Sequence, residues 1–249
     1  MHIYFRWKFL LRLSLLSLSI AGLAFIGITG TSQLAYAQID SQLETNGWKE
    51  FTFDDQRQNT FRQIEEGIIE IETNNSVSIA YLAFDTGKLD LRKTSNLVFE
   101  WQHEGQVIDT DVSNKGGDDR IIAIYLAFPY QPEHASLKEK LLRPLVVASQ
   151  GRDAPGRLLT YLWAGEPKVG RWFENPYTGK AGYMKVIQDA KDGTNNANIW
   201  HTHKVDIVAD FQDKFGYMPP TPAYVAIGVD SDDTKMRAII RVRGLKFVQ

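Results

Sequence analysis

The sequence contains no cysteine, and this absence removes two classes of exported protein. No disulfide can form, so the fold must be stable through its core alone. No cysteine is available to carry the lipid of a bacterial lipoprotein either. If residues 1–37 are removed, the 212 residues that remain (249 minus 37) are enough for one domain with a sizeable core.

Basic residues are outnumbered by acidic ones, and removal of the amino terminus increases the difference. The chain has 28 Lys and Arg against 30 Asp and Glu, and Arg6, Lys8 and Arg12 all lie within the first 37 residues. Removing them leaves 25 basic residues (28 minus 3) against 30 acidic ones, a net charge of about −5. The remainder has no basic cluster. We therefore expect no nucleic-acid partner, because binding to a phosphate backbone requires a basic surface.

The short motifs of common enzymes are also missing. The sequence has no Gly-x-Ser-x-Gly, no His-Glu-x-x-His, no phosphate-binding glycine loop and no Glu-x-Asp-x-x-Glu of the concanavalin-like glucanases. A glycosidase would need two carboxyl groups roughly 5–10 Å apart across a cleft. The candidate acids are Glu100, Glu104, Glu174 and Asp118, but spacing in sequence does not give that distance. The sequence identifies no catalytic residue and favours a noncatalytic role.

Residues 1–37 have the three parts of a secretory signal peptide. Basic residues come first, an apolar run from Leu13 to Ile28 follows, and Ala35-Tyr36-Ala37 is a small-x-small cleavage site. The alternative is an uncleaved membrane anchor, although the run is shorter than the ~20 residues of a comfortable span. We expect cleavage before Gln38, no stable membrane span afterwards, and a single domain over residues 38–249 that is periplasmic or secreted.

Short strand-like segments recur from Trp48 to the end of the chain. They are rich in Ile, Val, Phe, Tyr and Trp and are separated by turn residues, which is typical of all-β proteins. We expect nine to eleven strands, the clearest at 67–72, 77–84, 97–101, 121–128, 157–163, 183–188, 200–208, 224–229 and 237–248.

Helical segments are few, which argues against a parallel α/β fold. We expect about two helical turns at 136–142, before Pro144, and two more at 209–215, ended by Gly216. Neither is long enough to form a helical layer. The pattern predicts an antiparallel β-sandwich, jelly-roll or concanavalin-like, in which 121–128 is a central strand because it is apolar on both faces.

Five motifs appear in a fixed order along the second half of the chain: Lys115-Gly116-Gly117-Asp118-Asp119, Tyr161-Leu162-Trp163, Asn175-Pro176-Tyr177-Thr178, Trp200 with Asp210-Phe211 and Phe215-Gly216, and Asp230-Ser231-Asp232-Asp233-Thr234. This order resembles a family of exported bacterial proteins known only as domain of unknown function 3047, over roughly residues 48–247. The resemblance implies a β-sandwich in the periplasm or outside the cell and brings no catalytic residue. The His201-Thr202-His203 pair departs from the family pattern.

Two acidic turns suggest a calcium site. Asp230, Asp232 and Asp233 place hard oxygen ligands within one turn between two predicted strands, and Asp118 could join them if the two strands are neighbours. A shared cation would relieve the repulsion between these carboxylates. The alternative is that these residues form turns by bonding their own backbone. Calcium is the one candidate cofactor.

Aromatic residues concentrate between Tyr161 and Tyr177. In the Gly/Pro-rich part of this segment, Trp172 and Tyr177 are candidates for stacking on sugar rings, with Arg171 and Asn175 bonding the hydroxyls. Of Tyr161 and Trp163, at least one is expected in the core.

The sequence thus favours noncatalytic binding of carbohydrate or another cell-envelope ligand by an exported β-sandwich. A polysaccharide-active hydrolase or lyase, using acids near Asp118 and Asp232, is the first alternative. A structural envelope protein without a small ligand is the second. The oligomeric state is not determined by the sequence.

Overall fold

The computed structural model describes residues 39–84, 89–195 and 198–249. The predicted signal peptide, residues 1–37, lies outside the described residues. None of the helices within the described ranges is both long and apolar enough to cross a membrane.

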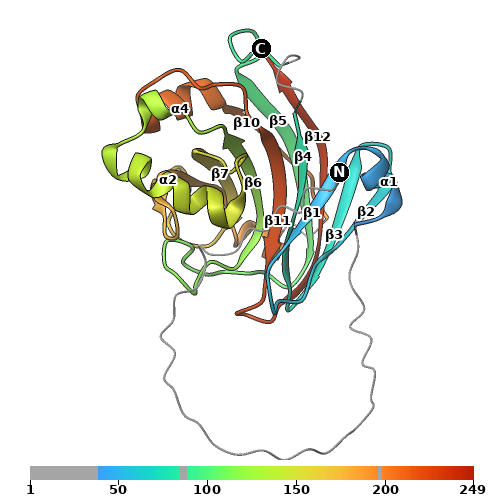
Figure 1. The fold of residues 1–249 in the computed structure, drawn as a ribbon. Helices are drawn as coiled ribbons and strands as arrows, with labels where there is room; N and C mark the ends of the chain where they lie inside the picture. The colour runs from blue at the N-terminus through green and yellow to red at the C-terminus, as the bar shows by residue number, and fades with distance from the viewer. Residues whose placement is uncertain (1–38, 85–88, 196–197) are drawn as a thin grey trace, which may run out of the picture.

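The described residues form a sandwich of two β-sheets (Figure 1). The seven-stranded sheet, called the large sheet below, contains, in spatial order, β1 (Trp48–Thr52), β4 (Val77–Ala83), β11 (Tyr224–Asp230), β6 (Arg120–Phe128), β7 (Arg157–Ala164), β9 (Gly179–Asp189) and β8 (Trp172–Asn175). The five-stranded small sheet contains β10 (His201–Asp206), β5 (Asn96–Gly105), β12 (Arg237–Val248), β3 (Ile68–Asn74) and β2 (Thr60–Glu65). Neighbouring strands are antiparallel except β7 and β9, which are parallel. The predicted antiparallel β-sandwich is confirmed.

The core lies between the sheets and is built by alternate residues of each strand. In β6, Ile122, Ile124 and Leu126 point to the small sheet and are fully buried. In β5, Phe99 and Trp101 meet them from the other side, while Val98 and Glu100 lie on the outer face. Tyr161 and Trp163 are both fully buried, which confirms the expectation for this pair.

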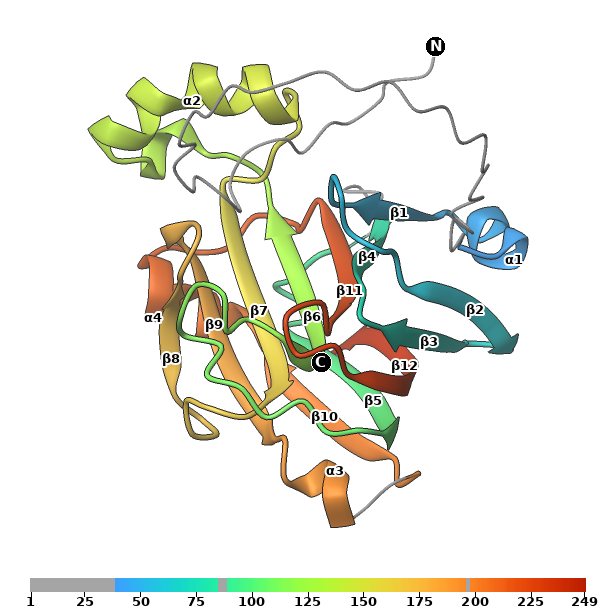
Figure 2. The ribbon, with the colours of Figure 1, turned by 90° about the horizontal axis from the view of Figure 1, so that it is seen from below.

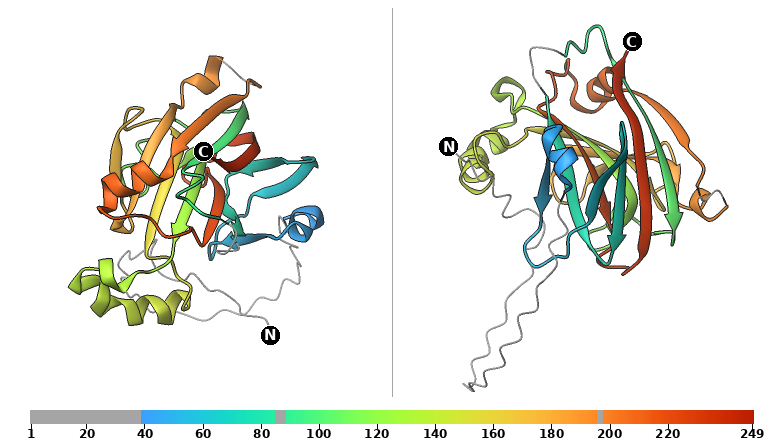
Figure 3. Two further views of the ribbon diagram at one scale, coloured as in Figure 1. Left: turned by 90° about the horizontal axis from the view of Figure 1, so that it is seen from above. Right: turned by 90° about the vertical axis from the view of Figure 1, so that its right-hand side faces the viewer.

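The helices are short and lie at the margins of the sheets: α1 (Ser41–Thr45), a 3-10 turn (Pro132–His134), α2 (Leu137–Gln150), α3 (Asp192–Asn195) and α4 (Ile207–Phe215). Helix α4 ends at Gly216, which adopts a left-handed conformation with φ of 80°, as predicted. Figures 2 and 3 show α2 standing away from the two sheets.

The prediction that the first helix ends before Pro144 is wrong, because α2 continues to Gln150. Proline removes one helical hydrogen bond, but side chains of the residues before Pro144 hold α2 in place. At its start Ser136 and Glu139 form a capping box. In its middle, Arg143 donates hydrogen bonds to the carbonyl oxygens of Arg152 and Ala154, in the chain that follows the helix.

The connection between β5 and β6, residues 106–119, crosses the outer face of the large sheet. Figure 2 shows this segment, in green, running over β7, β8 and β9. Its Val112 packs with Leu162 and Ala164 of β7 and with Val186 of β9 in a second, smaller apolar cluster. The cluster also includes Ala123 of β6, and Tyr125 of β6 packs against it, so the covered part of the outer face extends to the edge of β6.

Candidate functional site

Three tyrosines lie together on the outer face of the large sheet, and we call them the tyrosine face. Tyr81 of β4 and Tyr125 of β6 are both in register with Ala226 of β11, one on each side of it. Tyr224 lies two residues before Ala226 on the same face, and its ring is 5.8 Å from that of Tyr81. All three side chains are half-buried, because their alternate neighbours form the core.

A repeated tetrapeptide creates this arrangement. The sequence Tyr-Leu-Ala-Phe occurs at residues 81–84 and again at 125–128. The two copies flank β11 in the same register, so that Leu82 and Leu126 both face Val225 while Ala83 and Ala127 both face Tyr224. Neighbouring strands are about 4.8 Å apart, so the Cα atoms of Tyr81 and Tyr125 are roughly 10 Å apart.

The ring of Tyr125 lies down on the sheet because β11 has a glycine beneath it. A Cβ atom at Gly228 would be 3.2 Å from a ring carbon of Tyr125 and 3.0 Å from the side chain of Ile79. The hydroxyl of Tyr125 accepts a hydrogen bond from Arg120 at 2.6 Å, which fixes the direction of the ring. The ring of Tyr125 therefore leans over Gly228, with its hydroxyl directed to Arg120.

Arg120 is the centre of a polar cluster at one end of the tyrosine face. Its side chain is 8% exposed, and its Nη1 lies 3.3 Å from a carboxylate oxygen of Asp230, which is 7% exposed. The same nitrogen donates to the backbone carbonyl of Asp118. Arg120 is the first residue of β6 and Asp230 the last of β11, and the two are paired in register. The pair is therefore positioned by neighbouring strands of one sheet.

Burial raises the pKa of Asp230 well above its ordinary value. Arg120 opposes this shift, but the carboxylates of Asp118, Asp119 and Asp232 add to it, so one cation faces several acids. The Oδ1 atom of Asp230 is buried without a hydrogen-bond partner within the described residues. A carboxyl group with these properties can hold a proton at a pH at which exposed carboxyl groups are ionised.

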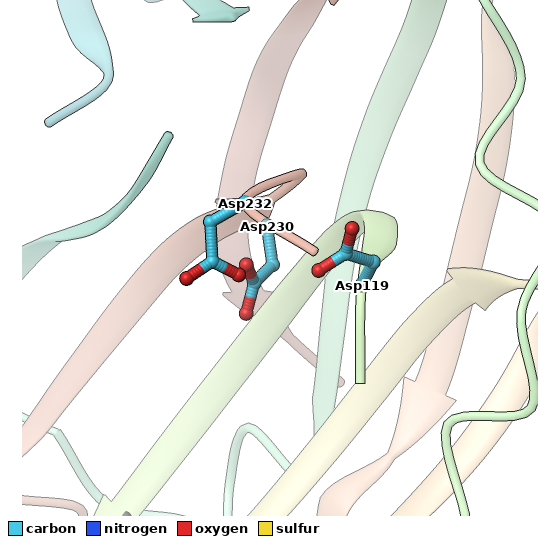
Figure 4. A group of neighbouring side chains, drawn as sticks. All are labelled: Asp119, Asp230 and Asp232. Atoms are coloured by element: carbon cyan, nitrogen blue, oxygen red, sulfur yellow. The ribbon is translucent and has the colours of Figure 1, made fainter. Parts of the chain in front are cut away.

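The structure brings together three carboxylates suited to a metal ion, and two of them belong to the predicted calcium set. Asp119, Asp230 and Asp232 can each offer an oxygen atom within 4.8 Å of the other two. Figure 4 shows Asp232 beside Asp230 in the turn after β11, with Asp119 approaching from the segment before β6. The expected approach of the two acidic turns is therefore present, with Asp119 rather than Asp118 in the group.

The other two predicted ligands have different surroundings. The carboxylate of Asp118 accepts a hydrogen bond from the hydroxyl of Tyr177 at 2.6 Å. Asp233 is not in the group of three, and its backbone N–H donates to Asp119 at 3.4 Å. Asp119 also accepts bonds from the backbone and hydroxyl of Thr234, so it already fixes the turn that follows β11. Calcium binding stays a prediction.

The four residues predicted to bind a ligand do not form one group. Trp172 lies on the inner side of β8, 6.0 Å from the ring of Tyr161, with the ammonium groups of Lys185 and Lys214 over its ring at 5.1 and 5.5 Å. Tyr177 instead reaches the polar cluster through Asp118. The side-chain oxygen of Asn175 accepts bonds from the backbone of residues 177 and 178, and Arg171 is exposed.

The outer face of the small sheet differs from the tyrosine face because it is a ladder of ion pairs. Arg243 donates to Glu100 at 2.6 Å, and Arg241 donates to Glu70 at 2.9 Å and to Glu104 at 3.0 Å. Hydrogen bonds from Arg243 and Thr202 lower the pKa of Glu100. Of the four candidate catalytic acids, Glu100 and Glu104 are therefore held by arginines, Asp118 is bonded to Tyr177, and Glu174 is exposed on β8.

The histidine pair of β10 packs against tryptophan rings. His201 lies 5.0 Å from Trp163 and His203 lies 4.8 Å from Trp101, so the two share a face as the strand spacing predicts. Burial lowers the pKa of His203 to about 4, and its Nε2 is 3.0 Å from the side-chain oxygen of Gln188. Across the described ranges, no third metal ligand lies within reach of this pair.

Residues 46–246 match the family described as "Protein of unknown function (DUF3047)". The chain belongs to this family. No curated protein matches it. Among solved structures, a family 12 xyloglucanase from Bacillus licheniformis in complex with a ligand has a TM-score of 0.40 and 8% identity, covering 81% of this chain and 86% of that one. A loop-swap mutant of Xyn11A from Necallimastix patriciarum has a TM-score of 0.34 and 12% identity, covering 80% and 99%.

Proposed function

We propose that this DUF3047 protein is exported and that its tyrosine face binds carbohydrate, or another glycan-bearing component of the cell envelope, without cleaving it. The observation that carries the proposal is the set of three half-buried tyrosines on adjacent strands β4, β11 and β6. Aromatic rings can stack on the apolar faces of sugar rings, and they do so with little loss of side-chain entropy because they are already held by the sheet.

The polar cluster beside the rings supports the same proposal. Ligand sites combine an apolar surface with a few fixed polar groups that orient the ligand. Tyr177 and Lys115 form such a margin, with the ammonium of Lys115 5.6 Å from the ring of Tyr177 and the Tyr177 hydroxyl held by Asp118. These groups can bond hydroxyls at the end of a sugar chain that lies across the tyrosines.

Hydrolysis is the second candidate, and the raised pKa of Asp230 is the observation that favours it. A protonated carboxyl group is what a glycosidase uses as its general acid. However, the acid must reach the glycosidic oxygen, and the side chain of Asp230 is 7% exposed beneath Arg120. Burial of both members of the pair therefore favours binding over catalysis.

A glycan array tests the binding proposal. The full chain should bind at least one glycan, and Tyr81→Ala should weaken that binding by about ten-fold, the equivalent of one lost aromatic stacking contact. Tyr130→Ala is the matched control, because Tyr130 stacks under Arg143 near α2 and not on the tyrosine face. No binding to any glycan, or equal losses in the two variants, would contradict the proposal.

Two further variants separate the alternatives. If Trp172→Ala abolishes binding and Tyr81→Ala does not, the site lies at β8, as the sequence alone suggested. Release of new reducing or unsaturated ends from the bound polysaccharide, lost in Asp230→Asn, would establish the hydrolase or lyase alternative instead. A protein that binds no glycan and remains associated with envelope fractions would agree with the structural alternative.

A further inference from the structure

Helix α2 carries a row of leucines on the side that faces away from the protein. Leu137, Leu141 and Leu145 recur every four residues, which places them on one face of the helix, and their exposed fractions are 75, 69 and 67%. Leu142 beside them is 43% exposed. None of the four belongs to either apolar cluster of the described residues. We call these four residues the leucine stripe.

The opposite side of α2 is held to the β-sandwich by charged groups. Glu139 accepts a hydrogen bond at 2.5 Å from Arg157, the first residue of β7. Arg143, four residues further along the same side, has its guanidinium carbon 4.4 Å from the centre of the Tyr130 ring and donates to the carbonyl oxygen of Ala154 at 2.7 Å. An ordinary surface helix turns its apolar side to the core and its charges to water. In α2 this arrangement is reversed.

The reversal leaves an apolar surface that the fold does not use. Single exposed apolar side chains are common on protein surfaces, whereas contiguous ones mark a surface that contacts another molecule or a membrane. Figures 2 and 3 show α2 projecting beyond the two sheets, so a flat surface can approach its outward side. The leucine stripe is therefore a contact surface without a partner among the described residues.

Two ammonium groups flank the leucine stripe. Lys138 and Lys140 lie on its two sides, because successive helical residues are turned by roughly 100° from each other. Both lysines are exposed, and neither forms an ion pair or hydrogen bond within the described residues. The one acidic residue of α2, Glu139, is held by Arg157 on the other side of the helix. The chain without residues 1–37 has a net charge of about −5, so the positive charge beside the stripe runs against the composition.

The surface of an anionic membrane matches both features. An interfacial helix buries its apolar side at the boundary between headgroups and acyl chains. Lysines at the margins of such a helix keep their stems on apolar atoms while their ammonium groups reach anionic headgroups. A second copy of the chain fits less well, because a stable interface involves about 20–30 residues on each partner and the stripe is one side of a 14-residue helix. Such a contact would also bring the same lysines toward each other.

We propose that α2 is a membrane-surface helix that binds bilayers containing anionic phospholipid, with the leucine stripe among the acyl chains and Lys138 and Lys140 at the phosphates. The sandwich stays in water, because Glu139 and Arg143 join it to the side of α2 that is turned away from the lipid. The site is separate from the proposed glycan site, since no residue of the tyrosine face belongs to α2.

Co-sedimentation with lipid vesicles tests the proposal. The full chain, with the amino terminus that its host leaves, should bind vesicles of equal parts phosphatidylcholine and phosphatidylglycerol, and should bind phosphatidylcholine alone more weakly. Leu141→Gln should weaken binding by about ten-fold, because one leucine no longer enters the lipid. Lys138→Gln and Lys140→Gln should each weaken binding to the mixed vesicles by about five-fold and leave binding to phosphatidylcholine unchanged.

Ile64→Gln is the matched control, because Ile64 is an exposed apolar residue of β2, away from α2 (Figure 2), and it should bind the vesicles as the wild type does. All of these side chains are exposed, so no variant should change the melting temperature. Absence of wild-type binding to the mixed vesicles, or equal binding by Leu141→Gln and Ile64→Gln, would overturn the proposal. A wild-type dimer that Leu141→Gln converts to a monomer, without vesicle binding, would overturn it in favour of a second copy.

The absence of cysteine allows a direct test of the location. Leu141→Cys and Ile64→Cys each provide a single thiol for a fluorophore whose emission moves to shorter wavelength in an apolar environment. The mixed vesicles should cause this shift in labelled Leu141→Cys and not in labelled Ile64→Cys. No shift in Leu141→Cys, or the same shift in both variants, would show that the leucine stripe does not enter the bilayer.

Discussion

The buried pair of Arg120 and Asp230 allows a prediction whose size can be worked out from the structure. In Arg120→Met, Asp230 keeps its buried position but loses the cation 3.3 Å away and remains close to the other carboxylates. Removing one partner of a buried pair typically costs about 3–5 kcal/mol of unfolding free energy, because the remaining charge is uncompensated. For a domain of this size, that corresponds to a fall in melting temperature of roughly 6–20 °C.

The loss should depend on pH in a defined direction. The folded-state pKa of Asp230 is raised, and removing Arg120 raises it further, so the folded state binds a proton that the unfolded state has released. Stability therefore falls as pH rises from the unfolded value of about 4 through the folded value. The difference between Arg120→Met and wild type should be smallest near pH 4 and largest above pH 7.

Urea unfolding at several pH values provides the measurement. Arg237→Met is the matched control, because Arg237 pairs with Glu72 at 3.5 Å but is 68% exposed, and such a pair contributes about 0–1 kcal/mol. The double variant Arg120→Met, Asp230→Asn should recover part of the loss, since it removes the uncompensated charge. If Arg120→Met costs no more than Arg237→Met, or costs most at low pH, the reasoning about this cluster is wrong.

Three other outcomes follow from buried titratable groups and the acidic turn. Burial raises the pKa of Glu50 to about 7, so its ionisation destabilises the fold as pH rises from about 4.5 to about 7, and Glu50→Gln should raise the melting temperature at pH 8 but not at pH 4.5. Burial lowers the pKa of His203 to about 4, so the folded state resists protonation of this ring and the free energy of unfolding falls as pH falls from about 6.5 to about 4. An NMR titration midpoint of His203 near pH 6.5 would refute this burial argument. Calcium should raise the melting temperature of the wild type, and Asp232→Ala should abolish the rise, whereas a calcium-independent melting temperature in the wild type would remove the metal prediction.

Strand patterns identified most of the sandwich because burial leaves a local signature. The run at 121–128, apolar on both faces, became the central strand β6, in which all but Tyr125 are buried. Strand β2 was not among the clearest predicted segments, because Phe61 is its one fully buried side chain and the others are more polar. Strand β8 has four residues at the edge of the large sheet, too few to show a period.

The tyrosine face was missed for a different reason. Each tyrosine lies in a strand that the sequence predicted, and the repeated Tyr-Leu-Ala-Phe is visible in the printed sequence. What the sequence does not show is that β4 and β6, about 40 residues apart, are both neighbours of β11, which comes about 100 residues later. The face exists only in that strand order, whereas the Trp172 to Tyr177 segment is local and was therefore noticed first.

The most direct measurement of the central proposal is an NMR titration of isotope-labelled protein with the glycan that the array binds most tightly. Chemical-shift changes should concentrate at Tyr81, Tyr125 and Tyr224 and at the turn that carries Tyr177, with the outer face of the small sheet unaffected. Changes confined to the neighbourhood of Trp172, or to the ion pairs of Arg241 and Arg243, would show that the tyrosine face is not the binding site.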